Sequence, residues 1–208
     1  MKALILAQAD AAVGKLTNEK QQAIRDTADE IIDVLSDYRD INPMINEDTS
    51  KGENISEVIS TESELTGRIL CVPTRSSLDE AAAAMLAQLL EKRGIKAIVQ
   101  PIETSRTVKN RSDNVPDAQL ICLSYFGSMA KPAHVRYQIR RFKRVLPQAR
   151  FLACFWMLGE ESAKAEDWKV AVGADFVATS LDQAAQICAH EMHDAFGVNI
   201  PIFRKVIS

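Results

Sequence analysis

From residue 67 onward the sequence alternates short apolar runs with longer segments whose apolar residues recur at helical spacing. Two of these runs, LICLS and FLACFWM, are apolar on nearly every residue, which is typical of parallel strands buried on both faces. The pattern predicts strands over 68–73, 96–100, 118–124, 150–157 and 175–178, and helices over 78–93, 131–145, 160–172 and 181–195. We therefore expect residues 67–208 to form an α/β, flavodoxin-like domain, with a five-stranded parallel sheet and helices on both faces.

The first 40 residues have a helical pattern and form a predicted N-terminal arm. Its second half carries a narrow apolar stripe of about two heptads, made of Ile24, Ala28, Ile31, Leu35 and Tyr38. Such a stripe suits self-association through residues 20–38 and packing on the protein's own body equally well, and both alternatives stay open. Residues 41–66 are polar and acidic, so we expect a flexible linker between the arm and the domain.

Composition narrows the function classes. The chain is 47% hydrophobic and 25% charged, with a net charge of −3, as in ordinary soluble proteins. Its apolar runs are far shorter than the roughly 20 residues of a membrane-spanning helix, and no signal peptide is evident. The four cysteines lack the close spacing of disulfide frameworks and zinc sites, so we expect reduced thiols and a cytoplasmic location.

Charge is distributed unevenly along the chain. The arm and linker are acidic, whereas residues 131–150 contain only basic charges, with Arg136, Arg140 and Arg144 at steps of four on one helix face. His134, Arg141 and Lys143 enlarge this predicted basic face. It is interpreted as a solvated surface, with docking on the acidic arm or on anionic lipid headgroups as alternatives. Without interleaved aromatic residues, we expect no dedicated nucleic-acid site.

The loops after the predicted strands are the places to look for a ligand, because open parallel sheets bind ligands at the carboxyl ends of their strands. The loop after the first strand offers Thr74, Arg75, Ser76 and Ser77 before a helix N-terminus, where an anion or small polar molecule can bind. It has no glycine-rich fingerprint for a dinucleotide. Alternatively the loop only caps the helix: Ser77 and Glu80 fit a capping box, and Asp79 complements the helix dipole.

Two further loops complete the candidate site. After the third predicted strand, Ser124, Gly127 and Ser128 are small, and Phe126 can supply a flat wall; Gly159 follows the fourth strand. A turn with core aromatic residues is an equal alternative. Neither Ser124 nor Cys122 has a base nearby in the sequence, and His190 and His193 lack the spacing of the zinc-protease motif. We therefore expect no catalytic site and no metal, with a small hydrolase or transferase using Ser124 or Cys122 as the alternative.

The order of four segments, RILCVP, LDEAAAAMLAQLLEKRGIKAIV, LICLS and GADFVATSLDQAAQI, resembles the cobalamin-binding domain family. That family carries Asp-x-His-x-x-Gly after its first strand, where this chain has TRSSLDE, so we expect no cofactor held by a histidine. The resemblance places Ser124 and Phe126 in the family's Ser-x-Leu motif and Gly159 in its Gly-Gly motif, and it implies a degenerate ligand site.

The helical arm followed by this domain resembles the cytosolic C-terminal region of autoinducer-exporter-type permeases, on the stretch LILAQADAAVGKLTNEKQQAIRDTADEIIDVLSDY. This resemblance implies a non-enzymatic regulatory or small-ligand-binding module that is the soluble part of a membrane transporter. Its expected partners are a small polar ligand, a membrane-embedded permease portion and the anionic inner face of the membrane. A structural module that dimerises through residues 20–38 is the further alternative.

Overall fold

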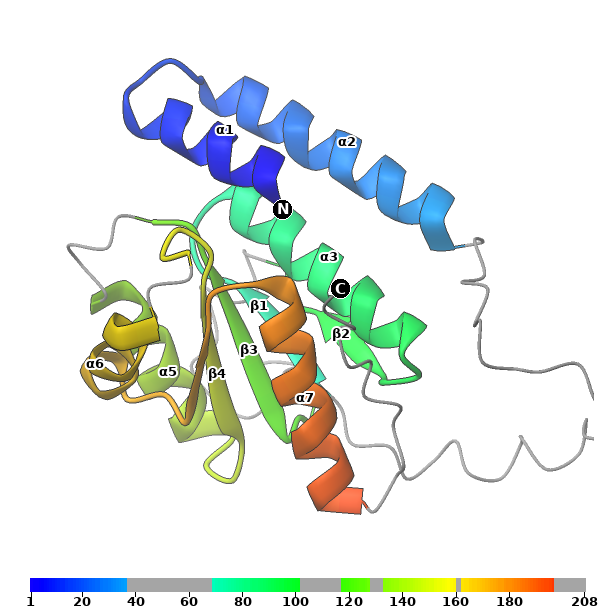
Figure 1. The fold of residues 1–208 in the computed structure, drawn as a ribbon, viewed down its shortest axis with the longest axis vertical. Coiled ribbons are helices and arrows are strands. Elements are labelled where there is room, and N and C mark those ends of the chain that lie inside the picture. Colours follow the sequence, from blue (N-terminus) through cyan, green and yellow to red (C-terminus); the bar gives the residue numbers. More distant parts are fainter. Residues whose placement is uncertain (37–68, 102–116, 128–132, 160–161, 197–208) are drawn as a thin grey trace, which may run out of the picture.

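The computed structural model describes residues 1–36, 69–101, 117–127, 133–159 and 162–196 (Figure 1). The helices are α1 (Lys2–Ala12), α2 (Asn18–Ser36), α3 (Ser77–Lys92), α5 (Ala133–Val145), α6 (Ser162–Val172) and α7 (Leu181–Phe196). The strands are β1 (Ile69–Pro73), β2 (Ala97–Val99), β3 (Leu120–Tyr125), β4 (Arg150–Phe155) and β5 (Phe176–Ala178). The predicted linker, 41–66, lies outside the described residues.

The five strands form one sheet in the order β2-β1-β3-β4-β5, and every neighbouring pair is parallel. This arrangement confirms the predicted α/β flavodoxin-like fold. The ends of the elements differ from the predicted ranges by a few residues; the strand predicted over 96–100, for example, is limited to Ala97–Val99.

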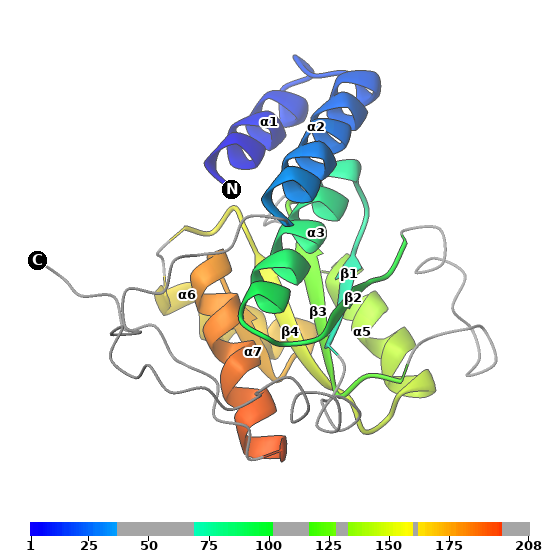
Figure 2. The ribbon, with the colours of Figure 1, turned by 90° about the vertical axis from the view of Figure 1, so that its right-hand side faces the viewer.

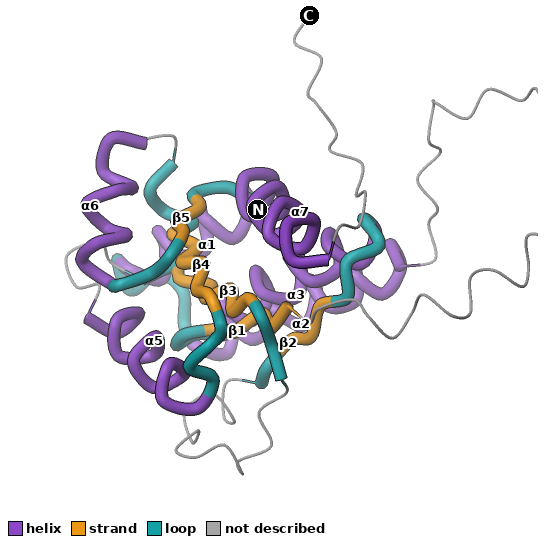
Figure 3. The backbone as a smooth tube through the Cα atoms, turned by 90° about the horizontal axis from the view of Figure 1, so that it is seen from below, coloured by secondary structure: helices purple, strands orange, loops and turns teal. Residues whose placement is uncertain are grey.

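The sheet is buried on both sides, which is why its central strands are continuously apolar. Every residue of β1 and β3 is buried. Side chains of alternating residues point to opposite faces: Cys71 and Cys122 belong to the core beneath α3 and α7, whereas Leu70 and Ile121 belong to the core beneath α5. Figure 3 shows the sheet between these two helical layers. Each layer encloses a separate hydrophobic core.

The strand order reverses between β1 and β3, because β1 pairs with β2 on one side and with β3 on the other. The chain leaving β1 enters α3 on one face, and α5, the next described helix after β3, packs on the other. The chain segments that leave β1 and β3 therefore lead to opposite faces of the sheet. The carboxyl end of this strand pair is the topological switch point of the sheet. The Thr74 amide donates a hydrogen bond to the Ser124 carbonyl at 3.2 Å and joins the two strand ends there.

The predicted arm consists of two helices, α1 and α2, which lie side by side over α3 (Figures 1 and 2). Leu4 and Ala7 of α1 are buried and belong to the same hydrophobic core as the buried side chains of α3, and Ile24 and Ala28 of α2 pack against it. The first half of the α2 stripe thus packs on the protein's own body, whereas Ile31 and Leu35 are exposed and Tyr38 lies outside the described residues. Self-association through residues 20–38 stays a prediction.

Within the part of the chain that the structure describes, no helix combines the length and the apolar character needed to cross a bilayer.

Candidate functional site

A single carboxylate ties together the two loops of the switch point. Asp79 Oδ2 accepts hydrogen bonds from Thr74 Oγ1 at 3.0 Å, from the Arg75 amide at 2.8 Å and from the Ser76 amide at 3.0 Å. Its Oδ1 accepts a fourth from the Phe126 amide, across the switch point, at 2.8 Å. The Arg75 and Ser76 amides, in the loop before α3, are therefore already bonded to a carboxylate of the protein itself.

The same residue closes the helix cap, and here the sequence prediction is wrong in detail. The N-cap of α3 is Ser76, not Ser77, and the capping box pairs Ser76 with Asp79 rather than Ser77 with Glu80. The Asp79 amide donates to Ser76 Oγ at 3.2 Å. Both pairs fit the spacing of a capping box. The pair Ser76 and Asp79 forms the box because Asp79 then points inward and accepts from the Phe126 amide. Glu80 instead points toward α2, where its Oε2 lies 3.7 Å from Nε of Arg25.

Asp79 is completely buried, and this burial raises its pKa above the ordinary value of 3.8. The hydrogen bonds from Ser76, Phe126, Arg75 and Thr74 act in the opposite direction, because each favours the charged form. The carboxylate makes four hydrogen bonds, about the full acceptor capacity of its two oxygens. It is a structural clamp, and it has little capacity left for a substrate.

Two buried polar atoms in this region have no hydrogen-bond partner among the residues that the structure describes: Ser124 Oγ and Trp156 Nε1. Ser124 lies near the end of β3, in register with Cys154 of β4, and Trp156 directly follows β4. Ser124 shares its side of the sheet with Cys122, and Trp156 belongs to the core on that side, beneath α3 and α7. Both atoms thus lie at the carboxyl ends of neighbouring strands, on the face that carries the arm.

The structure divides the other predicted site residues. Arg75 is exposed and Ser77 is half-buried, but Thr74 is buried and bonded to Asp79. Phe126 is also buried in the core, so its ring is not the exposed wall that the sequence suggested. Ser128 lies outside the described residues. Gly159 has φ +59° in the turn after β4 and is exposed.

Tyr125 and Gly127 form a close pair at the end of β3. A Cβ atom on Gly127 would lie 2.3 Å from the Tyr125 ring, so any larger residue here would force the Tyr125 side chain to move. Burial raises the pKa of Tyr125, and the negative charge of Asp79 raises it further, while Arg75 lowers it. The phenol is therefore protonated at neutral pH.

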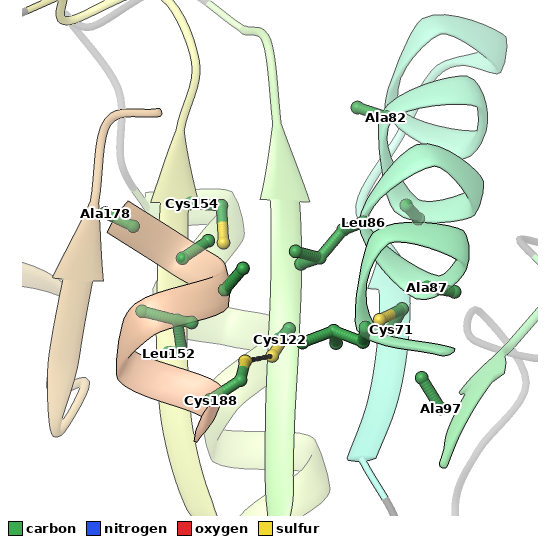
Figure 4. Close-up of a cluster of buried hydrophobic side chains, with 14 of the residues drawn as sticks. Cys71, Ala82, Leu86, Ala87, Ala97, Cys122, Leu152, Cys154, Ala178 and Cys188 are labelled. Atoms are coloured by element: carbon green, nitrogen blue, oxygen red, sulfur yellow. Dashed lines mark hydrogen bonds between the residues drawn. The ribbon is translucent and has the colours of Figure 1, made fainter. Parts of the chain in front are cut away.

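The four cysteines, far apart in the sequence, are all buried in the core beneath α3 and α7 (Figure 4). Cys71 and Cys122 are partners in the β1–β3 register, and the sulfur of Cys122 lies 3.5 Å from that of Cys188 on α7. Interaction with the neighbouring thiols and burial raise the pKa of Cys122 well above its ordinary value, and burial does the same for Cys154. The Cys122 and Cys154 thiols are therefore protonated and poorly nucleophilic. The sequence shows only that three of the cysteines occur in predicted strands and Cys188 in a predicted helix, and their clustering depends on strand register and on the packing of α7.

The predicted basic face on α5 is smaller than expected. Arg136, Arg140 and Arg144 are exposed, as the spacing predicts, but Arg141 is buried and its guanidinium lies 5.7 Å from the centre of the Tyr137 ring. Lys143 donates to the Gly173 carbonyl at 3.1 Å. On α7, His190 and His193 are both exposed. Among the described residues no cluster of three potential metal ligands occurs.

No protein-family model matches the chain, and no curated protein matches it either.

Proposed function

We propose that the chain is a non-enzymatic regulatory module that binds a small polar ligand at the switch point. The observation that carries this proposal is the pair of unpartnered polar atoms, Ser124 Oγ and Trp156 Nε1, at the ends of β3 and β4. A buried polar group without a partner costs about 1–3 kcal/mol, and open parallel sheets bind their ligands at this edge. A ligand with hydrogen-bonding groups for both atoms removes this cost.

The chemistry of the nearby groups supports binding rather than catalysis. Ser124 Oγ has no hydrogen-bond partner and hence no base to activate it, among the residues that the structure describes. The pKa of the Cys122 thiol is raised, which keeps it protonated. The carboxylate of Asp79 is occupied by four donors of the protein. The alternative of a hydrolase or transferase using Ser124 or Cys122 gains no support from this geometry.

The position of the arm suggests how binding acts as a signal. Ser124 is fully buried and Trp156 nearly so, so a ligand reaches them only when the elements covering this face move. Leu4 and Ala7 of the arm belong to the same hydrophobic core as Trp156. Ligand entry therefore favours a displaced arm. In our proposal the arm passes this change to the membrane-embedded permease portion of a transporter, at the inner face of the membrane.

Thermal unfolding with panels of free amino acids, nucleosides and monosaccharides tests the proposal. We expect at least one compound to stabilise the protein in a concentration-dependent manner. Ser124→Ala is expected to weaken that compound's binding by about 2–10-fold, the value of one hydrogen bond, without destabilising the ligand-free protein. Ser36→Ala, at the exposed end of α2, is the matched control and should bind like the wild type.

Three results would overturn the proposal. The first is that no compound of the panels stabilises the protein. The second is that Ser124→Ala binds the stabilising compound as well as the wild type does. The third is that Ser124→Ala destabilises the ligand-free protein by about 1 kcal/mol or more, because the hydroxyl would then already have a partner such as an ordered water.

A further inference from the structure

The helices on the two faces of the sheet carry opposite charge. α5 and α6, on one face, contain seven Lys or Arg and two acids, Glu166 and Asp167. α1, α2, α3 and α7, on the other side, contain four Lys or Arg and twelve acids. Figure 3 shows these two groups of helices on opposite sides of the strands. The small net charge of the whole chain, −3, therefore combines one basic and one acidic layer.

The exposed side of α5 concentrates the positive charge. Arg136, Arg140 and Arg144 recur at steps of four, and all three are exposed. A helix rises about 1.5 Å per residue, so neighbouring members of this arginine row lie about 6 Å apart along the helix axis. α5 contains no Asp or Glu that could neutralise them.

The three guanidinium groups of the arginine row are available to a partner. Within the part of the chain that the structure describes, none of them makes an ion pair or a hydrogen bond. The other two bases of α5 are engaged, because Arg141 is buried and Lys143 donates to the Gly173 carbonyl at 3.1 Å. Lys143 is nevertheless exposed, so its charge adds to that of the row.

The other exposed residues of α5 indicate what kind of partner fits. They are Ala133, Tyr137 and Lys143, so this side of the helix has no aliphatic side chain larger than that of alanine. The centre of a stable protein–protein interface is apolar and poor in charges. Tyr137, 55% exposed, is a single ring rather than the series of rings on which single-stranded nucleic acid stacks. A tyrosine ring does suit the headgroup region of a membrane.

An anionic membrane needs no pocket and no apolar interface. Its headgroups form a plane of negative charge that attracts clusters of Lys and Arg. The same plane repels the acidic layer, so the domain approaches with α5 toward the lipid. The apolar side of α5 is buried in the core through Val135, Ile139 and Phe142, so the helix stays on the membrane surface and does not insert.

We propose that the arginine row of α5 docks the domain on an anionic membrane surface through charge alone. Arg136, Arg140 and Arg144 contact the headgroups, and Lys143 strengthens the local positive potential. The proposal does not rest on the polar ligand of the switch point, because it uses no residue of that site.

Flotation of the full chain with lipid vesicles tests the proposal. Vesicles of phosphatidylcholine with about 30% phosphatidylserine are compared with vesicles of phosphatidylcholine alone. We expect binding to the anionic vesicles, its loss at about 0.5 M salt, and no binding to the neutral vesicles. Each basic residue near an anionic membrane strengthens binding about fivefold. Arg136→Gln, Arg140→Gln and Arg144→Gln combined should therefore weaken binding about a hundredfold.

Two further variants separate the arginine row from net charge and from guanidinium geometry. Lys2→Gln, Lys15→Gln and Lys20→Gln combined make the same change of net charge at exposed lysines of the arm, and this variant should bind like the wild type. All the replaced residues are exposed, so both triple variants should keep the unfolding temperature of the wild type. Replacing the arginine row with three lysines should change binding less than about threefold, because attraction to a lipid plane depends on charge.

Several results would overturn the proposal. It fails if the protein does not float with anionic vesicles, if neutral vesicles bind it equally well, or if the two triple variants are weakened alike. It also fails if the lysine variant binds as weakly as the glutamine variant, because recognition would then require the planar guanidinium. Tighter binding to a short DNA duplex than to anionic vesicles at the same salt, or self-association through the arginine row in light scattering, would assign the row to another partner. The test of Ser124 uses no residue of α5, so the two proposals can fail separately.

Discussion

Replacing Asp79 with asparagine is the most direct test of the clamp at the switch point. Asparagine has almost the same shape, but only one of its two terminal atoms accepts hydrogen bonds. If that oxygen keeps the bonds from Thr74, Arg75 and Ser76, the amide group of asparagine faces the Phe126 amide, donor against donor. The substitution therefore breaks the bond between Asp79 and the Phe126 amide, which joins the start of α3 to the end of β3.

The expected cost follows from these four bonds. The orphaned Phe126 amide costs about 1–3 kcal/mol, and each of the other three bonds loses about 1 kcal/mol when its acceptor becomes neutral. Removing a buried charge returns part of this sum. We expect a net loss of about 2–4 kcal/mol at pH 7, a large fraction of the usual 5–15 kcal/mol of a folded domain.

Urea denaturation followed by circular dichroism measures this loss. With a slope of about 2 kcal/mol per molar urea, the midpoint of Asp79→Asn should fall by about 1–2 M. Asp182→Asn is the matched control: the same substitution in the first turn of α7, on a side chain that is largely exposed. It should cost less than about 1 kcal/mol. Hydrogen exchange of the Phe126 amide should also accelerate more in Asp79→Asn than exchange of amides in β4.

An Asp79→Asn protein as stable as Asp182→Asn would refute the clamp. The same conclusion would follow if stability fell but the Phe126 amide kept its protection, because the loss would then not come from the bond across the switch point.

Three further predictions concern the arm, the thiols and pH. Leu4→Ala should lower the free energy of unfolding in urea by about 2–4 kcal/mol, because Leu4 is 4% exposed within the core. Leu6→Ala, at a residue 68% exposed, should leave it almost unchanged, and equal effects would mean that the arm does not pack as described. All four thiols should resist 5,5′-dithiobis(2-nitrobenzoate) in the native protein and react in urea, since all are buried, and rapid reaction of any thiol in the native state would contradict this. Burial raises the pKa of Asp79 above 3.8, so the folded protein holds this proton more tightly than the unfolded chain does. The stability that this proton provides is complete below pH 3.8 and is lost as the pH rises through the pKa of Asp79 in the folded state. The advantage of the wild type over Asp79→Asn in urea denaturation should therefore be larger at pH 3.5 than at pH 7, and an advantage that grows with pH would show that the hydrogen bonds outweigh burial.

Much of the candidate site was accessible from the sequence, but its chemistry was not. The position of the loop after β1 follows from the strand–helix alternation, and the capping spacing there is evident in SSLDE. Two overlapping pairs fit that spacing, however, and only the packing of β3 beside β1 determines which acid turns inward. Phe126 is a similar case, because a strand-end aromatic residue can line a pocket or fill the core, and here it fills the core.

The sequence by itself determined the parallel α/β fold and the helices of the arm, because strands buried on both faces and amphipathic helices produce distinct periodicities. Only the tertiary structure decided which residues meet. The register of β1 and β3 brings Cys71 beside Cys122, and the docking of α2 on α3 directs the first half of its stripe to the core and leaves the described residues of the second half exposed. The physical reason is that periodicity depends on neighbours along the chain, whereas register and docking depend on surfaces that come together only when the chain folds.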